Sequence, residues 1–511
     1  MKKIYYNGDF ITLENYEIEA MLVEDGIIKK VGDLEKVLSL KDDETKLIDL
    51  DGNTMMPAFI DAHSHFSGVA NNFLKVNLED CKNFKEMKEK LKKFKEEKNI
   101  KDNVWILADG YDNNYLEEKI HPRKEIIDEV LPNNPVVVQH KSGHMGVFNT
   151  KALQEFNIEE LEKNTGYMEE NSFLHYLNKI PLPDIKDLLN SYEKAQQEYL
   201  SNGIATVQDG MSYISIIPIY QALLEKNKLK IDLVSYIPIK DNQTFFTNFN
   251  KHIKEYKNNF KIGGYKIFQD GSPQARTAWM RKPYIDSPNY FGISTMTNIE
   301  VEKAVEIGIN TNMQLLAHCN GDKAAEQFIN SVKKHKKSAK NIRPVMIHAQ
   351  FLGIDQIGDL KKYGIIPSFF IPHVFYFGDI HIKNLGYSRA SKISPANSAL
   401  KKNITFTFHQ DSPVIKPNMF ETIWCAVTRI TKSGVILGEN ERISVINAIK
   451  ALTLNSAYQY FEENEKGSIK EGKNADLIII DKNPLKINFD EIKNIKVIET
   501  IKKGATLFRS N

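Results

Sequence analysis

The chain has 511 residues, of which 41% are hydrophobic, and its formal net charge is +2. This length suffices for one large domain with a substantial core and a smaller second domain, and the near-neutral charge argues against a nucleic acid or a membrane surface as the main partner. The N-terminal stretch has no apolar run long enough for a signal peptide, and no window of the sequence approaches the roughly 20 apolar residues that span a bilayer. Cys81, Cys319 and Cys425 are too scattered for a disulfide framework, so we expect a cytoplasmic protein.

The two ends of the chain read as short strands. Near the N-terminus, the stretch AMLVEDGIIKKVGD predicts a hairpin with Asp25 and Gly26 at the turn. Near the C-terminus, the stretch GSIKEGKNADLIIIDKNP is also strand-like and rich in turn residues. We therefore predict a small β-sandwich domain built from both termini, residues 1–56 and 464–511.

The middle of the chain, residues 57–463, alternates strands with helices. The predicted strands cover residues 58–65, 203–209, 230–238, 263–269, 313–319, 344–350, 365–370 and 405–411. Amphipathic stretches separate most of them, and one of these, residues 322–337, carries Ala325, Phe328, Ile329 and Val332 at helical spacing. Eight strands in such alternation predict an α/β fold of the (β/α)8 TIM-barrel type.

Residues 68–190 read as an insertion after the first barrel strand. Its apolar runs VWILADG and PVVVQHKSGH do not fit the count of eight strands, and we expect them to form a small separate sheet. Residues 84–98 predict a solvated helix with one apolar stripe. Such an insertion could fold over the barrel mouth as a lid.

The stretch FIDAHSHF, residues 59–66, ends an apolar run with two histidines separated by one serine. Because strand side chains alternate between faces, we expect His63 and His65 to point to one spot. Active sites of barrels lie at the carboxyl ends of the strands. The side chains predicted at those ends are His63 and His65 on the first strand, Lys266 on the fourth, His318 on the fifth, His348 on the sixth and Asp411 on the eighth. Each alone could be structural, but together imidazoles and a carboxylate predict a site for zinc or a similar divalent ion.

The order His-x-His, Lys, His, His, Asp resembles the metal-dependent amidohydrolase superfamily, and the resemblance covers nearly the whole chain. MPAFIDAHSHF resembles its first metal motif, and GSIKEGKNADLIIID resembles its closing segment. The stretches KIFQDGSPQARTAW, HCNGDKA, IHAQF and HQDSPV resemble the YtcJ-like branch, amidohydrolase family 3, which includes N-substituted formamide deformylases. Ala58 stands where a glycine is usual, and HCNGDKA replaces a more common isoleucine and arginine, but neither departure removes a ligand.

The resemblance implies a ligand set for one or two divalent ions. His63 and His65 would bind the buried ion, for which we expect zinc first, although the ligands also suit iron and manganese. His318 and His348 would bind a second ion, or one of them would contact the first.

The resemblance also assigns the lysine and the aspartate. Lys266 matches a lysine that is carboxylated in two-metal members and bridges the ions, since an unmodified ammonium group has no lone pair. The other interpretation is that Lys266 is a charged neighbour of a one-metal site. Asp411 matches the residue that ligates metal and handles protons.

Substrate contacts are expected at three residues. His144, in KSGHMGVFNT on the insertion, matches a motif of the same branch, and His373 follows the seventh strand at the barrel mouth. Arg276 fits a substrate anchor or a structural ion pair equally well. Glu170 falls where the family carries a glutamate, and a surface position suits it too.

Three other polar residues are predicted to have mainly structural roles. His409 shares the face of Asp411 but could simply pack. Asp322 is predicted to cap the following helix. Asp270 is predicted to form a turn with Gly271, with a site role left open.

Together these features predict a metal-dependent hydrolase that cleaves a C–N bond, of the amide or N-substituted formamide type, in a small molecule. A metal-activated hydroxide would attack the carbonyl, and Asp411 would carry the proton to the leaving nitrogen. Two alternatives stay open: a mononuclear aminohydrolase (deaminase), which one ion per chain and an unmodified Lys266 would favour, and a non-catalytic regulatory member, which the absence of bound metal would favour. We expect a small-molecule substrate and no nucleic-acid or membrane partner, and we leave a homodimer open.

Overall fold

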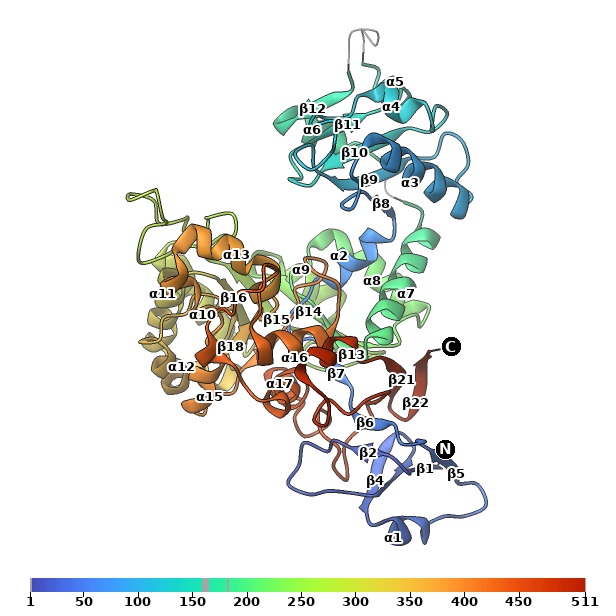
Figure 1. Ribbon diagram of the computed structural model, residues 1–511, viewed down its shortest axis with the longest axis vertical. Coiled ribbons are helices and arrows are strands. Elements are labelled where there is room, and N and C mark those ends of the chain that lie inside the picture. The colour runs from blue at the N-terminus through green and yellow to red at the C-terminus, as the bar shows by residue number, and fades with distance from the viewer. Residues whose placement is uncertain (1, 159–164, 182, 511) are drawn as a thin grey trace. The chain divides into compact units, whose positions relative to one another are not determined.

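The computed structural model describes residues 2–158, 165–181 and 183–510 (Figure 1). The chain divides into two compact units, one spanning Met1–Phe66 and Gln196–Asn511 and the other spanning Ser67–Ala195. Helix α7 (Ile185–Ser201) belongs partly to each. In the part of the chain that the structure describes, no helix combines the length and the apolar character needed to cross a membrane. The domain boundaries expected from the sequence stay a prediction.

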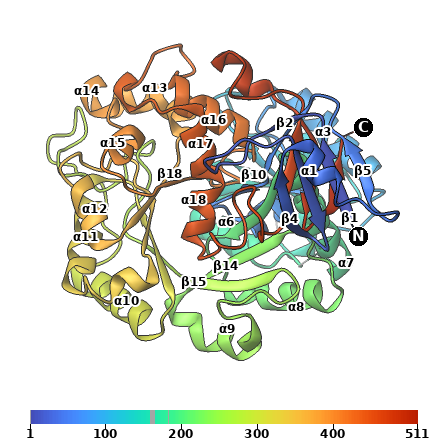
Figure 2. The same cartoon turned by 90° about the horizontal axis from the view of Figure 1, so that it is seen from below.

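The first unit is built on an eight-stranded parallel sheet, hydrogen-bonded in the order β19-β18-β17-β16-β15-β14-β13-β7. The bounds of these strands are β7 (Phe59–Ile60), β13 (Ile204–Asp209), β14 (Asp232–Pro238), β15 (Phe260–Phe268), β16 (Gln314–Cys319), β17 (Val345–His348), β18 (Ile366–Phe369) and β19 (Thr407–Phe408). Nearly all their residues are buried, as is typical of parallel strands that helices cover. The sheet is curled, with α9 to α12 on its outer side (Figure 2). Among the described strands no ladder pairs β19 with β7, so the closed barrel stays a prediction.

Helices follow the strands along the chain. Their bounds are α2 (Phe66–Asn72), α8 (Ile217–Glu225), α9 (Asn242–Asn248), α10 (Asn298–Asn310), α11 (Asp322–Lys334), α12 (Ile357–Tyr363), α13 (His373–Leu385), α14 (Tyr387–Ala390), α15 (Ala396–Lys401), α16 (Met419–Thr428), α17 (Val445–Leu452) and α18 (Leu454–Gln459). The helix predicted over 322–337 is confirmed as α11, and its predicted apolar positions are buried. The predicted cap is wrong, because Gly321 holds the N-cap position while Asp322 is the first helical residue. The Asp322 Oδ1 atom accepts a hydrogen bond from Arg281 N at 2.7 Å instead.

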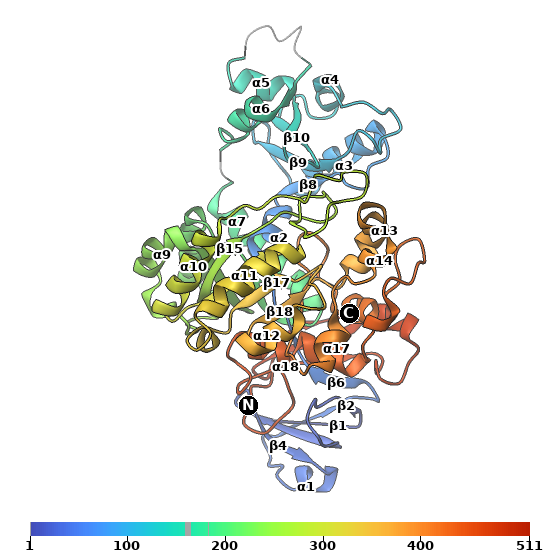
Figure 3. The ribbon, with the colours of Figure 1, turned by 90° about the vertical axis from the view of Figure 1, so that its left-hand side faces the viewer.

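Segments from both termini form two further sheets in the first unit. One has the order β4 (Ile27–Gly32), β3 (Ala20–Glu24), β1 (Lys2–Tyr6), β5 (Lys46–Asp49), and the other has the order β2 (Asp9–Phe10), β6 (Thr54–Pro57), β20 (Leu477–Ile480), β21 (Val497–Lys502), β22 (Ala505–Arg509). The hairpin predicted at Asp25 and Gly26 is confirmed by the antiparallel pairing of β3 with β4. One apolar core contains side chains from both sheets, among them Tyr5, Met55 and Leu477. Figure 3 shows β1, β2, β4 and β6 gathered at one end of this unit together with α1 (Leu34–Leu38). The sandwich geometry stays a prediction.

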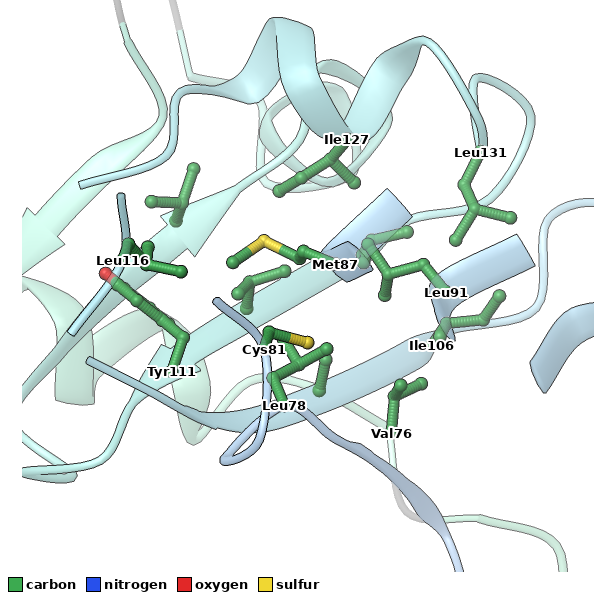
Figure 4. Close-up of a cluster of buried hydrophobic side chains, with 14 residues drawn as sticks. Val76, Leu78, Cys81, Met87, Leu91, Ile106, Tyr111, Leu116, Ile127 and Leu131 are labelled. Atoms are coloured by element: carbon green, nitrogen blue, oxygen red, sulfur yellow. The ribbon is translucent and has the colours of Figure 1, made fainter. Parts of the chain in front are cut away.

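The second unit contains its own five-stranded sheet. Its order is β12 (Tyr167–Glu169), β11 (Met145–Phe148), β10 (Val136–His140), β9 (Ile106–Tyr111), β8 (Lys75–Asn77). Its helices are α3 (Phe84–Glu97), α4 (Lys124–Asp128), α5 (Thr150–Glu155) and α6 (Glu170–Leu177). Helix α3 confirms the predicted helix and buries Met87 and Leu91 in the core of this unit, beside Ile106 and Ile127 (Figure 4). The apolar runs VWILADG and PVVVQHKSGH, which did not fit the eight predicted barrel strands, therefore contain β9 and β10, and these two strands pair in parallel.

Candidate metal centre

His63 and His65 lie beyond the end of the first strand of the eight-stranded sheet. A strand was expected over 58–65, but β7 ends before either histidine, so strand alternation does not orient the two imidazoles. Their positions are set by backbone hydrogen bonds to the segment after β19: Asp411 N donates to His63 O at 3.1 Å, and His65 N donates to Ser412 O at 2.7 Å. As a result, the Nε2 atoms of His63 and His65 lie 3.4 and 3.2 Å from Asp411 Oδ1.

The other predicted ligands approach this group from neighbouring strands. Lys266 lies on β15, and its Nζ is 3.1 Å from His63 Nε2. His348 is the last residue of β17 and places its Nε2 3.9 Å from Asp411 Oδ2. The His318 ring, on β16, has its centroid 4.5 Å from that of His348. All the residues predicted as metal ligands thus lie together at the carboxyl ends of the strands, and metal binding by them stays a prediction.

The backbone around these side chains is strained and closely packed. His348 has φ of 70° and Asp411 has φ of 54°, both in the left-handed region. Such a conformation costs about 1–3 kcal/mol per residue and persists where the surroundings impose it, often at functional sites. Gly210, after β13, has no room for a side chain, because a Cβ there would lie 2.4 Å from His63 Cε1. The sequence analysis did not single out this glycine.

Burial sets the protonation states of the group. It lowers the pKa of His63 and of His348 well below the ordinary value, so both imidazoles are neutral at pH 7. Burial opposes the ionisation of Asp411, but the adjacent His65 and the other imidazoles hold the pKa of this carboxyl well below its ordinary value. Burial also lowers the pKa of Lys266 to about 7. Neutral imidazoles and an ionised carboxylate are the forms that bind metal ions.

Two buried residues that the sequence analysis did not assign to the site contact its histidines. His63 Nδ1 lies 2.5 Å from Gln208 Oε1, at the carboxyl end of β13. His318 Nδ1 lies 3.3 Å from Asp270 Oδ1, and the Asp270 carboxylate also accepts hydrogen bonds from three backbone amides. Asp270 therefore does more than form a turn. Its position after β15 was the only signal in the sequence for this contact.

His409 is buried between two other polar side chains. Its Nδ1 lies 2.8 Å from Ser368 Oγ on β18, and its Nε2 lies 3.2 Å from His348 Nδ1. The ring centroids of His409 and His63 are 5.3 Å apart. His409 is thus part of the same histidine group and does not pack against apolar side chains alone.

Asp61 is a buried carboxyl two residues before His63, and burial raises its pKa from 3.8 to about 8. The carboxyl therefore stays neutral in the folded protein up to about pH 8, whereas it ionises near its ordinary pKa in the unfolded chain. Its contribution to stability is fully present below the unfolded pKa and is lost as the pH rises through the folded one. The buried neutral histidines have the opposite effect on the pH profile, but they act alike in the wild type and in Asp61→Asn. We therefore expect the urea midpoint of chelator-treated wild type to fall relative to that of Asp61→Asn as the pH rises from 5 to 8.

The matched control for this experiment is Asp43→Asn, because Asp43 is exposed on the surface. Its stability profile should parallel that of the wild type. An Asp61→Asn profile that also runs parallel to the wild type would contradict the assignment of the slope to Asp61.

His373 is buried at the start of α13, close to the histidine group. Its Nδ1 lies 3.1 Å from His381 Nε2, and its ring centroid lies 4.5 Å from that of Phe370. The Phe370 ring in turn lies 5.4 Å from His409. The Phe370 ring centroid is also 6.2 Å from that of His348, a predicted ligand, so Phe370 lies next to both His373 and the histidine group. Contact of His373 with substrate stays a prediction.

The remaining predicted contacts have local partners. Arg276 Nη2 donates hydrogen bonds to Ile285 O at 2.9 Å and to Ser287 Oγ at 2.7 Å, and since both acceptors are uncharged, neither contact is the ion pair that was the structural alternative. His144 belongs to the second unit, where its Nδ1 lies 3.4 Å from Glu170 Oε2 and both side chains are exposed. A role for Arg276 or His144 in binding substrate stays a prediction.

The donor set fits a divalent cation. His63 Nε2, His65 Nε2 and Asp411 Oδ1 all lie within 4.8 Å of one another. In the described part of the chain, Asp411 Oδ1 is a buried atom that makes no hydrogen bond of correct geometry. Because a buried polar atom without a partner is unfavourable, a cation bound by His63, His65 and Asp411 would stabilise the arrangement.

Known proteins resemble this chain over its full length. Residues 46–508 match the model of the Amidohydrolase family. The putative amidohydrolase YtcJ of Bacillus subtilis is 25% identical over 100% of both chains. The N-substituted formamide deformylase of Arthrobacter pascens is 24% identical over 95% of this chain and 94% of its own. The solved structure of an uncharacterized metal-dependent hydrolase from Pyrococcus furiosus superposes with a TM-score of 0.80 at 23% identity, covering 95% of this chain and 100% of that one, and this supports the curled parallel fold.

Proposed function

The chain belongs to the amidohydrolase family, and from this premise we propose that it is a metal-dependent hydrolase that cleaves a C–N bond in a small molecule. The observation that carries the proposal is the convergence of His63 Nε2, His65 Nε2 and Asp411 Oδ1, all within 4.8 Å of one another. The similarity to an N-substituted formamide deformylase supports an amide or N-substituted formamide as the substrate class.

The proposed ligands are those that lie together at the strand ends. His63, His65 and Asp411 would hold one divalent ion, for which we expect zinc, and His318 and His348 would bind a second ion or complete the first site. A bound divalent ion would polarise the carbonyl of the substrate and lower the pKa of a water molecule to about 7.

Asp411 would act as the proton carrier. Its carboxylate is ionised, its side chain is only 13% exposed, and it lies beside two imidazoles, so it is placed to accept a proton next to the proposed ion. In hydrolysis it would take one proton from the attacking water and return it to the leaving nitrogen, while the remaining OH group stays on the carbonyl carbon. We propose His373, one ring away, as a hydrogen-bond donor to the carbonyl oxygen, and His144 and Arg276 as further substrate contacts.

The chemical state of Lys266 would distinguish a one-ion site from a two-ion site. Its Nζ is buried 3.1 Å from His63 Nε2, where an ammonium ion would compete with a cation for the imidazole lone pair. Addition of carbon dioxide to the neutral Lys266 amine, with loss of one N–H proton, would form a carbamate and replace that positive charge with two oxygen ligands. We therefore propose that Lys266 is carboxylated in a two-ion site, whereas an unmodified Lys266 with one ion per chain would favour a deaminase.

Removal of the metal provides the direct test. We expect dialysis against a chelator to abolish hydrolysis, and zinc to restore it, whereas magnesium should not, because it prefers oxygen ligands. Elemental analysis of protein purified without chelators should give one or two ions per chain, and mass spectrometry of native protein should detect the carboxyl group on Lys266. Screening N-formyl and N-acyl amines would then identify the substrate. A purified protein that holds no metal and hydrolyses none of these compounds would contradict the proposal and favour a regulatory role.

The setting of the protein is also proposed from its sequence. We propose a cytoplasmic enzyme that acts on a small molecule, with neither nucleic acid nor a membrane as partner. Sedimentation analysis would show whether the chain forms a homodimer.

A further inference from the structure

His348 has one ring nitrogen toward the proposed metal and the other toward His409. Its Nε2 lies 3.9 Å from Asp411 Oδ2, whereas its Nδ1 lies 3.2 Å from His409 Nε2. The Nδ1 atom of His409 is in turn 2.8 Å from Ser368 Oγ. His348, His409 and Ser368 are buried, so bulk water does not supply alternative partners for the two rings and the hydroxyl.

Only one arrangement of protons in this chain leaves His348 able to bind a metal. A neutral imidazole has one N–H group and one lone pair. If His409 Nε2–H donated to His348 Nδ1, the proton of His348 would be on Nε2, and this atom would have no lone pair for a cation. If His348 Nδ1–H donates to His409 Nε2, then His348 Nε2 is free, and His409 Nδ1–H donates to Ser368 Oγ.

The same molecule contains a second histidine held in this way by an acceptor of known orientation. Gln208 Nε2 donates hydrogen bonds to Ala62 O at 2.8 Å and to Tyr460 Oη at 2.9 Å, which fixes its Oε1 toward His63. Because an amide oxygen only accepts, His63 Nδ1 must donate, at 2.5 Å, and His63 Nε2 keeps its lone pair. Gln208 thus accepts the Nδ1–H proton of His63 and leaves His63 Nε2 unprotonated. His409 is placed to do the same for His348.

We propose that His409 is a positioning residue that accepts the Nδ1–H proton of His348 and so keeps His348 Nε2 available as a metal ligand. This inference rests on the proposed metal-dependent function. Outer partners of metal-binding histidines typically change metal affinity by 10–100-fold when they are lost.

Two amide substitutions separate the acceptor role from simple filling of space. In His409→Gln the amide lies at the level of the imidazole Nε2, so its oxygen can accept from His348. In His409→Asn the amide lies at the level of Nδ1, so it can reach Ser368 but not His348. Both variants are polar and neutral, and circular dichroism and melting in chelator would show whether they fold alike.

The measurement is the affinity for zinc, determined by competition with a chromophoric chelator. We expect His409→Gln to bind zinc almost as tightly as the wild type and His409→Asn to bind it about 10–100-fold more weakly. If the two folded variants bind zinc with equal affinity, whether both match the wild type or both bind more weakly, the role of His409 as acceptor is overturned. A wild-type protein without zinc affinity would instead overturn the proposed function itself, so the two failures are distinguishable. If His409→Asn does not fold, weak zinc binding by folded His409→Gln overturns the inference and tight binding supports it.

Discussion

Asp411→Asn is expected to lower kcat/KM by roughly 10³-fold, because an amide can neither accept a proton from water nor return it to the leaving nitrogen. The substitution keeps the shape of the side chain. It also suits the backbone, since Asp411 has φ of 54° and asparagine is among the residues that tolerate the left-handed region best. The loss should therefore reflect chemistry and not misfolding.

The test of Asp411→Asn needs metal content as well as turnover. Zinc per chain, the circular dichroism spectrum and kcat/KM should be measured together on Asp411→Asn, the wild type and the exposed control Asp43→Asn. The control should match the wild type in all three. An Asp411→Asn variant that holds its metal and retains activity would exclude Asp411 as the proton carrier.

Lys466→Met is expected to have the largest effect on stability. Lys466 is buried in the first unit, with its Nζ 2.5 Å from Asp232 Oδ2 and 2.9 Å from Glu462 Oε2. Two further buried lysines, Lys261 and Lys502, pair with the same carboxylates. Asp476, also buried, lies 3.9 Å from Lys502 Nζ and completes the group. Removing Lys466 therefore leaves three buried carboxylates with two lysines, and an uncompensated buried charge typically destabilises a protein by about 3–5 kcal/mol.

Lys486→Met is the matched control for Lys466→Met. Lys486 pairs with Asp9 Oδ1 at 2.8 Å, but its side chain is 66% exposed. A surface pair of this kind contributes about 0–1 kcal/mol. The urea midpoint and the melting temperature at a fixed scan rate should thus fall strongly for Lys466→Met and little for Lys486→Met. Equal losses in urea midpoint and melting temperature for the two substitutions would contradict the claim that the buried ion pairs of Lys466 stabilise the fold more than a surface pair does.

The periodic parts of the fold were predictable. The eight parallel strands are apolar runs because both faces of the sheet are buried, and α11 follows the helical spacing of Ala325, Phe328, Ile329 and Val332. The hairpin at Asp25 and Gly26 was predictable because few residue pairs suit such a turn. These features depend on residues close together in the sequence.

The predicted approach of His63 and His65 has a different physical origin from the one expected. Strand alternation was expected to point both imidazoles to one spot, yet β7 ends before both residues. Backbone hydrogen bonds to Asp411 and Ser412 hold them in place instead. Alternation along a strand is a local property of the chain, whereas these hydrogen bonds join segments more than three hundred residues apart in the sequence. The convergence was expected, but its cause was not.

By itself, the sequence determined which side chains stand at the strand ends, because each of them closes or follows an apolar run that its neighbours in the chain define. Only the tertiary structure decided what surrounds them: Gln208 beside His63, Asp270 beside His318, and His409 between His348 and Ser368. The same holds for the buried ion pairs of Lys466. A hydrogen bond or an ion pair depends on distances of about 3 Å between atoms from distant segments, and no periodicity or spacing along the chain encodes such a distance.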